Sequence, residues 1–457
     1  MIDSQEHHIS FPSRPVRVNF VLVMSTVVAA LGGLLFGLDT AVIAGTTDSL
    51  TRLFHLSPAA LGVTVSSALW GTIVGASFTG WLGERFGRRD SLRIMAALYV
   101  ISAIGCALAW NWPALLLFRI VGGIGIGGSS VLGPMYIAEI APAAWRGRLV
   151  GLFQINVVVG ILIAYLSNYV IGLQSLGTHE WRWQLGVPGI PAVIFLVALF
   201  YIPRSPRWLM YRGRSEEAKA SLVAVGENDA YAELDKIRQT LVDDATIGKE
   251  KLLSKRYRLP LFLAVSMGLF CQLSGINAIL YYLNDIFAAA GFTKLSGDLQ
   301  ATAIGATNLL FTFLAMFVID RVGRKFLLLV GSVGMAGTLI GVSVLFYTKQ
   351  HAAWLLWLLI GYAASFSFSE GAVMWVYIGE VFPTSVRAKG QGAGSLAHWI
   401  MNAIISGVFP VLAAKSRSLP FVFFALMMVL QFFVVFFVFP ETKGVSLEDM
   451  QKKLATE

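Results

Sequence analysis

Charged residues are scarce in this chain of 457 residues, at 13% of the total, which is about half the share found in a soluble domain. Hydrophobic residues make up 56%. The interior of a water-soluble fold cannot take up that much apolar surface. The composition therefore excludes a soluble fold and predicts an integral membrane protein.

Cysteine is rare as well. Cys106 and Cys271 are the two cysteines, and both fall in apolar stretches far apart in the chain, so a disulfide is not expected. None of the nine asparagines begins an Asn-x-Ser/Thr sequon, which favours a bacterial inner membrane over a eukaryotic surface. The segment before residue 18 lacks an apolar region followed by a small-residue cleavage site, so the first apolar stretch is expected to be an uncleaved insertion signal.

Patterns typical of enzymes are missing. The six histidines do not cluster at metal-ligand spacing, and the sequence shows no Ser-His-Asp arrangement. Gly123-Ile-Gly-Ile-Gly-Gly128 matches a dinucleotide-binding pattern, but it lies inside an apolar stretch with no strand before it, so it indicates close helix packing. We therefore expect no enzymatic activity, no cofactor and no bound metal.

The apolar residues are grouped into twelve stretches that contain no Asp, Glu, Lys or Arg and span at least 18 residues each. A helix needs about 20 residues to cross a hydrocarbon core of about 30 Å. The sequence therefore predicts an all-α integral membrane protein with twelve transmembrane helices. The stretches are residues 18–38, 56–83, 94–118, 120–138, 149–179, 183–202, 259–284, 299–319, 326–348, 352–369, 390–414 and 418–440.

Positive charge is distributed unevenly over the connections between these stretches. Connections after even-numbered stretches contain clusters that include Arg88, Arg146 and Arg324, whereas the opposite connections contain single charges such as Arg182. Basic residues favour the cytoplasmic side, so both termini are predicted to be cytoplasmic. The net charge of +9 is spread over many loops, so membrane lipid, and not nucleic acid, is an expected partner.

The sequence also repeats itself. Glu84-Arg-Phe-Gly-Arg-Arg89 recurs as Asp320-Arg-Val-Gly-Arg-Lys325, and Tyr136-Ile-Ala-Glu139 recurs as Tyr377-Ile-Gly-Glu380. The copies follow in the same order at nearly constant spacing. This pattern predicts two duplicated six-helix bundles.

Five segments are predicted from this organisation. The region between the bundles carries twelve basic and nine acidic residues, which indicates a cytoplasmic linker with short amphipathic helices. Both a plain tether and a regulatory element fit that composition. The segments are an N-terminal tail 1–18, a bundle 19–203, the linker 204–258, a bundle 259–440 and a C-terminal tail 441–457.

Several motifs together carry a family resemblance. Beside the repeated Asp/Glu-Arg-x-Gly-Arg loops, the chain contains Phe36-Gly-Leu-Asp39, Pro203-Arg-Ser-Pro-Arg-Trp-Leu209 and Pro440-Glu-Thr-Lys-Gly444. In this combination the chain resembles the sugar porter family of the major facilitator superfamily over nearly its whole length. The resemblance implies two bundles that rock about a central monosaccharide site, and we expect the chain to act as a monomer.

The resemblance also implies a set of cytoplasmic charges, here named the cytoplasmic latch. These charges are expected to pair across the two halves in the outward-facing state and to separate when the inside opens. The alternative is that they are topogenic charges at helix ends. The latch residues are Glu84, Arg88, Glu139, Arg146, Asp320, Arg324, Glu380 and Arg387.

Ionisable residues within the predicted membrane are informative, because a charge there costs roughly 2.5 to 3.5 kcal/mol on insertion scales. Asp39 and Arg119 form a plausible proton-coupling pair, since protonation of the carboxyl would release it from the guanidinium. A constitutive pair that fixes helix packing is the alternative. An Asp at this position resembles proton symporters of the family, where facilitative members often have Asn. Glu370 is another intramembrane acid, and its role stays open.

Sugar recognition needs side-chain amides for the hydroxyls and aromatic faces for the apolar side of the ring. The alternative for each membrane Asn or Gln is that its amide joins neighbouring helices and does not contact the sugar. Family members commonly have glutamine where Cys271 stands, so the identity of the sugar stays open. For His398, a cleft residue, a proton sensor and a residue with neither role are the open alternatives. By resemblance, the sugar contacts are Gln154, Gln272, Asn277, Asn308, Trp375, Trp399 and Asn402, and the extracellular gate is Tyr281 and Tyr282.

Together these features predict a secondary transporter that imports a monosaccharide with a proton by alternating access. A facilitative sugar uniporter is the nearest alternative, and a non-transporting sugar receptor is a further one. A drug–proton antiporter on the same fold is disfavoured, because residues 149–172 contain no proline.

Overall fold

The computed structural model describes residues 19–227, 229–247, 252–383, 386–445 and 450. Within these ranges, twelve helical segments are long and apolar enough to span a membrane. They follow the order of the twelve predicted stretches, so the predicted all-α membrane fold is confirmed. The predicted tail 1–18 and part of the tail 441–457 lie outside the described residues.

Helices of the N-terminal half begin where the local sequence supplies caps. The side-chain oxygens of Asn19, Ser57 and Asn111 each accept a hydrogen bond from the backbone N–H three residues ahead, which satisfies a free donor of the first helical turn. The elements are α1 (Phe20–Val42), η1 (Ile43–Gly45), α2 (Thr47–Phe54), α3 (Pro58–Phe86), α4 (Arg88–Ala107), α5 (Trp112–Ile140), α6 (Arg146–Leu173), η2 (Gly177–His179), α7 (Glu180–Gly186) and α8 (Gly189–Ala198).

Two spans of the C-terminal half are interrupted. Gly275 separates two helices with φ +87°, and a Cβ on it would lie 2.3 Å from the ring of Phe424, so the break requires glycine. Ser369 separates the two helices of the tenth span. The elements are η3 (Lys255–Tyr257), α12 (Arg258–Leu273), α13 (Ile276–Tyr281), α14 (Leu283–Ala289), α15 (Lys294–Val322), α16 (Arg324–Thr348), α17 (Trp354–Phe368), α18 (Glu370–Glu380), α19 (Arg387–Lys415) and α20 (Leu419–Val438).

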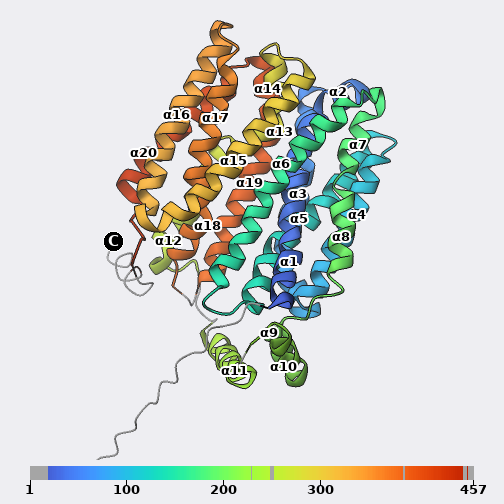
Figure 1. Cartoon of the computed structure of the whole chain (residues 1–457). Helices are drawn as coiled ribbons and strands as arrows, with labels where there is room; N and C mark the ends of the chain where they lie inside the picture. Colours follow the sequence, from blue (N-terminus) through green and yellow to red (C-terminus); the bar gives the residue numbers. More distant parts are fainter. Residues whose placement is uncertain (1–18, 228, 248–251, 384–385, 446–449, 451–457) are drawn as a thin grey trace, which may run out of the picture.

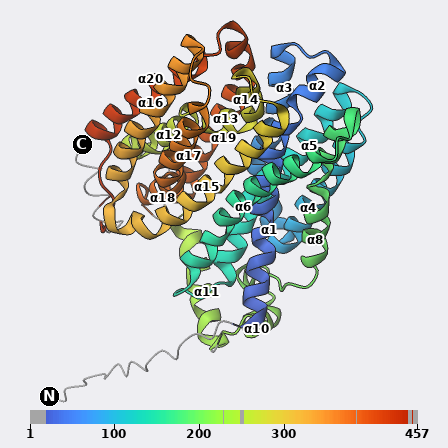
Figure 2. The ribbon, with the colours of Figure 1, turned by 45° about the horizontal axis from the view of Figure 1, so that its top comes forward.

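The two halves stand side by side, with the N-terminal half in blue to green and the C-terminal half in yellow to red (Figures 1 and 2). They meet mainly where α3 packs against α19 and α6 packs against α15. Three linker helices, α9 (Pro206–Tyr211), α10 (Ser215–Ala224) and α11 (Ala230–Ile247), lie at one end, and α2, α7 and α14 lie at the other (Figure 1). Following the predicted topology, we call these the cytoplasmic and the extracellular end.

The halves touch backbone to backbone toward the extracellular end. Gly62, near the start of α3, faces the carbonyl oxygen of Gly407, near the end of α19, and a Cβ on Gly62 would lie 1.9 Å from that oxygen. No side chain fits there. The extracellular end of the transport path is therefore closed at this contact.

The start of α16 is capped by a carboxylate from the far end of the chain. Glu441 accepts hydrogen bonds from the backbone N–H groups of Arg324, Lys325, Thr442 and Lys443, at 2.9 to 3.0 Å. Burial raises the pKa of Glu441, but these four bonds outweigh it and hold the pKa below its ordinary value. A carboxylate at a helix start also faces the positive end of the helix dipole.

Glu441→Ala should lower the stability of the protein by about 1 kcal/mol, as loss of a helix cap does, which corresponds to a melting temperature about 2 °C lower in detergent. The pKa of Glu441 is lower in the folded than in the unfolded protein. The difference in stability between the native protein and Glu441→Ala should therefore be largest at pH 7 and should shrink once the pH falls below about 4. Glu233→Gln, which removes an exposed pair with Lys236, is the control and should have little effect. Equal melting temperatures for Glu441→Ala and the native protein would contradict the capping role.

Candidate functional site

Charges at the cytoplasmic end form a network inside the N-terminal half. Arg88, at the start of α4, donates from Nε to Oε1 of Glu139, near the end of α5, at 2.9 Å. The hydroxyl of Ser205 donates to the other carboxylate oxygen of Glu139. The hydroxyl of Tyr136 donates to the carbonyl of Pro203 at 2.7 Å. The network ties the starts and ends of three spans together.

The same network recurs in the C-terminal half. Arg324, at the start of α16, donates to both carboxylate oxygens of Glu380 at 2.9 and 3.2 Å. The hydroxyl of Thr442 donates to Glu380 at 2.6 Å, and the hydroxyl of Tyr377 donates to the carbonyl of Pro440 at 3.2 Å. The duplication inferred from the sequence therefore extends to individual hydrogen bonds.

Four residues of the cytoplasmic latch form these pairs. Arg88 pairs with Glu139 and Arg324 pairs with Glu380, so each ion pair joins two residues of the same half. The expected pairing across the halves belongs to the outward-facing state, so for these four residues it stays a prediction. The ion pairs form within each half here because α4 lies against α5 and α16 lies against α18.

The other four latch residues lie at the same end. Glu84 and Arg146 are exposed. Asp320 pairs with Arg324 at 3.0 Å although its side chain is 79% exposed, and Arg387 donates to the carbonyl of Phe382 at 3.4 Å. Their role in a latch stays a prediction.

Four of the predicted sugar contacts meet around His398 in the C-terminal half. The amide nitrogen of Gln272, on α12, lies 3.0 Å from Nε2 of His398, on α19. Asn277, which α13 positions after the break at Gly275, donates to Oε1 of Gln272 at 3.2 Å. The three side chains form a chain of polar groups of the kind that sugar hydroxyls bind.

Aromatic rings complete this cluster. The ring of His398 lies 5.4 Å from that of Trp375, on α18, and 5.1 Å from that of Trp399. Trp375 is 41% exposed although it lies within a span, so a face of its ring is free to stack on a sugar. Trp399 also contacts Phe36 of α1 at 5.5 Å, and this contact joins the two halves.

The remaining predicted contacts are placed differently. Asn402 donates to the hydroxyl of Tyr281 at 3.4 Å, next to the cluster. Asn308 instead accepts a hydrogen bond from Ser367 of α17 at 2.7 Å, as a residue that joins helices does. Gln154 lies partly exposed on α6 of the N-terminal half. The structure thus brings five of the seven predicted contacts and the predicted gate residue Tyr281 close to one another in the C-terminal half.

Asp39 and Arg119 line one small cavity together with Trp399 and Tyr281. Arg119 is 3% exposed, and its Nε donates to the carbonyl of Thr64 at 3.2 Å. In the described part of the chain, Asp39 and Arg119 form no ion pair within 4.0 Å, so the predicted pair is apart here. The cavity has about 10 Å³ open to the centre of a water molecule, which is room for about one water and not for a sugar.

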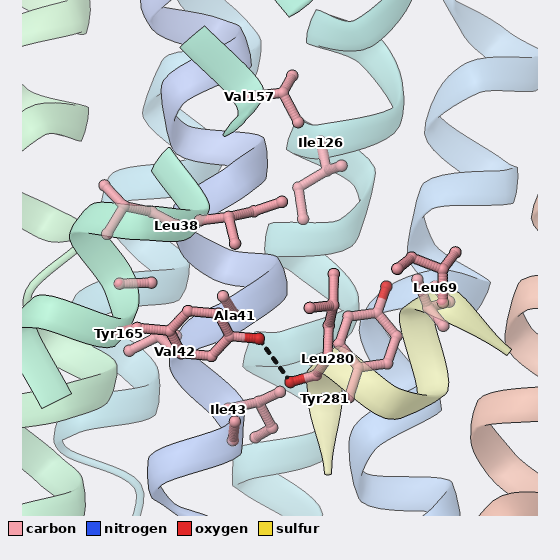
Figure 3. Packing of buried hydrophobic residues seen from close by; sticks show 14 of the residues in the cluster. Leu38, Ala41, Val42, Ile43, Leu69, Ile126, Val157, Tyr165, Leu280 and Tyr281 are labelled. Atoms are coloured by element: carbon pink, nitrogen blue, oxygen red, sulfur yellow. Dashed lines mark hydrogen bonds between the residues drawn. The ribbon is translucent and has the colours of Figure 1, made fainter. Parts of the chain in front are cut away.

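Tyr281, the predicted gate residue, lines this cavity. Figure 3 shows its ring among apolar side chains of the N-terminal half, which include Ile43 and Leu69. Beside it, the hydroxyl of Tyr165 donates to the carbonyl of Leu280 at 2.8 Å, from one half to the other (Figure 3). Tyr282 differs, because its hydroxyl donates to the carbonyl of Ser406 within its own half.

The chain is similar to proteins of one known family. Residues 25–454 match the family described as sugar (and other) transporters. The chain belongs to this family. The match covers nearly the whole chain, so the transporter has the fold expected for this family. It is a multi-pass protein of the inner membrane and not an enzyme.

Individual relatives give the same result. The transporter is 38% identical over 450 residues to the arabinose-proton symporter of Bacillus subtilis, with 96% of each chain covered. It is also similar to the xylose transporter of E. coli in its inward-open conformation, with a TM-score of 0.85 and 35% identity over 94% of this chain and 99% of that one. A proton:xylose symporter of the major facilitator superfamily bound to 6-bromo-6-deoxy-D-glucose has a TM-score of 0.77 at 35% identity, over 95% and 99% of the two chains.

Of these two structures, the inward-open one has the higher TM-score with the transporter. This agrees with the closed extracellular end, where Gly62 meets Gly407 and Tyr165 meets Leu280. It also agrees with cytoplasmic ion pairs that stay within each half. The extracellular end of the transporter is therefore closed in this structure.

Some contacts of the site have only an indirect signal in the sequence. His398 lies beside Trp399 and one helical turn before Asn402, and the second spacing places His398 and Asn402 on the same helix face. Ser205 and Thr442 each occupy the third position of a repeated proline motif, so the repeat itself contained the signal. Glu370 is fully buried at the break before α18, and its carboxyl oxygens have no hydrogen-bond partner in the described residues.

Gln272→Ala should weaken sugar binding by about tenfold, because one hydrogen bond to the ligand is lost and His398 and Asn277 lose their shared partner. Binding is measured as the sugar concentration that half-saturates counterflow in proteoliposomes. Gln174→Ala changes an exposed amide at the end of α6 and is the control. If both variants bind sugar like the native transporter, Gln272 is not a sugar contact.

Proposed function

We propose that this transporter imports a monosaccharide together with a proton across a bacterial inner membrane by alternating access. One observation carries the proposal. Helix α1 bears both Asp39, which faces the cavity shared with Arg119, and Phe36, which contacts Trp399 of the sugar cluster at 5.5 Å. Proton site and sugar site therefore meet on one helix.

The spacing of Phe36 and Asp39 explains how the two ligands can act together. Residues three apart lie on the same face of a helix. A proton on Asp39 and a sugar against Trp399 therefore both act on α1, and each ligand shifts the equilibrium between the two conformations only as far as it binds one better. Coupling of this kind needs no contact between proton and sugar, and no cofactor.

The proposed order of events follows from the charges. In the outward-facing state, Asp39 is ionised and is attracted to Arg119. Protonation of Asp39 removes that attraction and lets the halves close over the bound sugar. Asp39 and Arg119 line one cavity without an ion pair in the described residues of this inward-open-like conformation, which supports release of the pair at that stage. Release of sugar and proton to the cytoplasm then resets the cycle.

The substrate class is a pentose or a hexose. The names of the relatives support this range, since they include an arabinose and a xylose symporter and a complex with a glucose analogue. Cys271 is 4% exposed next to Gln272 and offers only a weakly polar thiol. We therefore propose that the side of the site formed by Cys271 makes fewer hydrogen bonds to the sugar hydroxyls than a glutamine would.

The assigned residue roles, the five segments and the monomeric state belong to the same proposal. One chain contains both halves, so a single copy supplies a complete path. We propose the residues given above for the sugar contacts, the gate, the proton site and the cytoplasmic latch. Asn308 stays among the proposed sugar contacts although it also accepts a hydrogen bond from Ser367.

Asp39→Asn should abolish uphill accumulation of sugar while sparing counterflow, because the amide mimics the protonated carboxyl and cannot release a proton. Accumulation and counterflow are measured in the same vesicles. Asp229→Asn, in the linker before α11, is the control and should accumulate sugar normally. A variant that still accumulates sugar against its gradient would refute the role of Asp39.

Sugar-driven alkalinisation of the medium distinguishes the proposal from facilitated transport. Adding sugar to cells that contain the native transporter should raise the external pH, since each imported sugar takes a proton with it. Asp39→Asn cells should give no such signal. Sugar uptake without alkalinisation in the native transporter would establish a uniporter.

Counterflow against a panel of pentoses and hexoses then identifies the sugar. At least one member of the panel should exchange, and Cys271→Gln should shift the preference among them, because it adds an amide donor and acceptor to the site. A native transporter that exchanges no carbohydrate would refute the proposed substrate class.

A further inference from the structure

A charged contact joins the two halves at the extracellular end. Nζ of Lys294, at the start of α15, lies 2.7 Å from Oε1 of Glu180, at the start of α7. Helix α15 belongs to the C-terminal half and α7 to the N-terminal half. The side chains of Lys294 and Glu180 are 37% and 12% exposed, so water reaches the pair only in part.

Polar side chains of each half flank the two members of this contact. Gln184, one turn after Glu180, donates to the same Oε1 at 3.2 Å. On the other side, Asp298 lies one turn after Lys294, is 1% exposed, and accepts a hydrogen bond from Asn284 through Oδ1. Oδ2 of Asp298 has no hydrogen-bond partner in the described part of the chain.

The carboxyl groups of Glu180 and Asp298 both lie close to Gly172. A Cβ built on Gly172, near the end of α6, would lie 3.4 Å from Oδ2 of Asp298 and 3.8 Å from Oε1 of Glu180. Acids of opposite halves are thus close together, and Lys294 is the cation beside them. Without its ammonium group, the like charges would push the halves apart.

We propose that Glu180 and Lys294 form an extracellular latch, an ion pair that holds the outside of the transporter closed and breaks whenever it opens outward. The proposal rests on the alternating access proposed above. It adds positioning residues that belong to neither the sugar site, the gate nor the cytoplasmic latch. Since α7 and α15 lie in different halves, outward opening has to separate the two side chains.

The charge of this contact distinguishes it from the rest of the extracellular closure. The contacts of Gly62 with Gly407 and of Tyr165 with Leu280 involve uncharged groups. A partly exposed ion pair is screened by salt, whereas those contacts are not. A dependence on ionic strength is therefore the signature of the extracellular latch.

The test measures how often the transporter opens outward. A single cysteine replaces Ser66, which is 4% exposed on α3 where α3 faces Gly407 of α19, in a chain whose Cys106 and Cys271 are changed to alanine. A membrane-impermeant thiol reagent is added from outside, without sugar, and labelling is normalised to total thiol after denaturation. The reporter lies on a different helix contact from the latch, so it detects opening of the whole interface.

Glu180→Gln should raise the labelling rate about three- to fivefold at low ionic strength, as loss of a partly exposed pair does. Lys294→Met should raise it further, because Glu180 and Asp298 are then left facing each other. The charge swap of Glu180→Lys with Lys294→Glu should restore slow labelling. High salt should reduce the difference between the native pair and Glu180→Gln.

Asp48→Asn is the matched control, because it breaks the pair with Arg52 at the same end but within one half. It should label like the native chain. Unchanged labelling in both Glu180→Gln and Lys294→Met, or an equal rise in Asp48→Asn, would overturn the extracellular latch. Labelling does not depend on transport, so a native transporter that moves no sugar while labelling behaves as expected would refute the proposed function and leave the latch standing.

Discussion

Hydrocarbon offers no hydrogen-bond partner, so a polar group within the twelve spans is costly unless it finds a partner inside the protein. Many hydroxyls do this within their own helix, as Thr72 does by donating to the carbonyl of Ala68 at 2.9 Å. Groups that cannot do so collect where helices meet. Arg119 donates to Thr64 of α3, and Gln272 reaches His398 of another helix. The polar clusters of the transporter therefore lie along helix contacts, where movement of the halves can change them.

That constraint separates two kinds of charged contact. The pairs of Arg88 with Glu139 and of Arg324 with Glu380 lie inside single halves and make each half a stiff unit at its cytoplasmic end. The pair of Glu180 with Lys294 lies between the halves. Contacts of the first kind can persist while the halves move, whereas contacts of the second kind have to be remade in every cycle. In the proposed function, helix α1 serves both the proton site and the sugar cluster.

Much of the fold follows from properties that are local in sequence. Twelve apolar stretches of sufficient length predict twelve spans, because crossing the hydrocarbon depends on length and composition. The break at Gly275 also has a local signal, since glycine tolerates the positive φ that the break needs. The break at Ser369 has none, because neither Ser369 nor Glu370 is a helix breaker. The family resemblance supplied most of the site residues.

Tertiary packing decided what the sequence left open. The repeat identified Arg88 and Glu139 as functional charges, but which half supplies the partner depends on how α4 lies against α5. Asn308 fits a family sugar position, yet its bond to Ser367 becomes visible only once α15 and α17 are side by side. Glu180 and Lys294 are single charges in separate connections, and no periodic pattern links them.

The contact of Gly62 with the carbonyl of Gly407 has a mechanical consequence. It is a hard steric stop, made of main-chain atoms that can neither rotate away nor be compressed. The end point of closure on that side is thus set by shape, while the time spent there is set by weaker attractive forces. Evolution can then tune how fast the carrier turns over by changing surface charges, without altering the geometry in which it comes to rest.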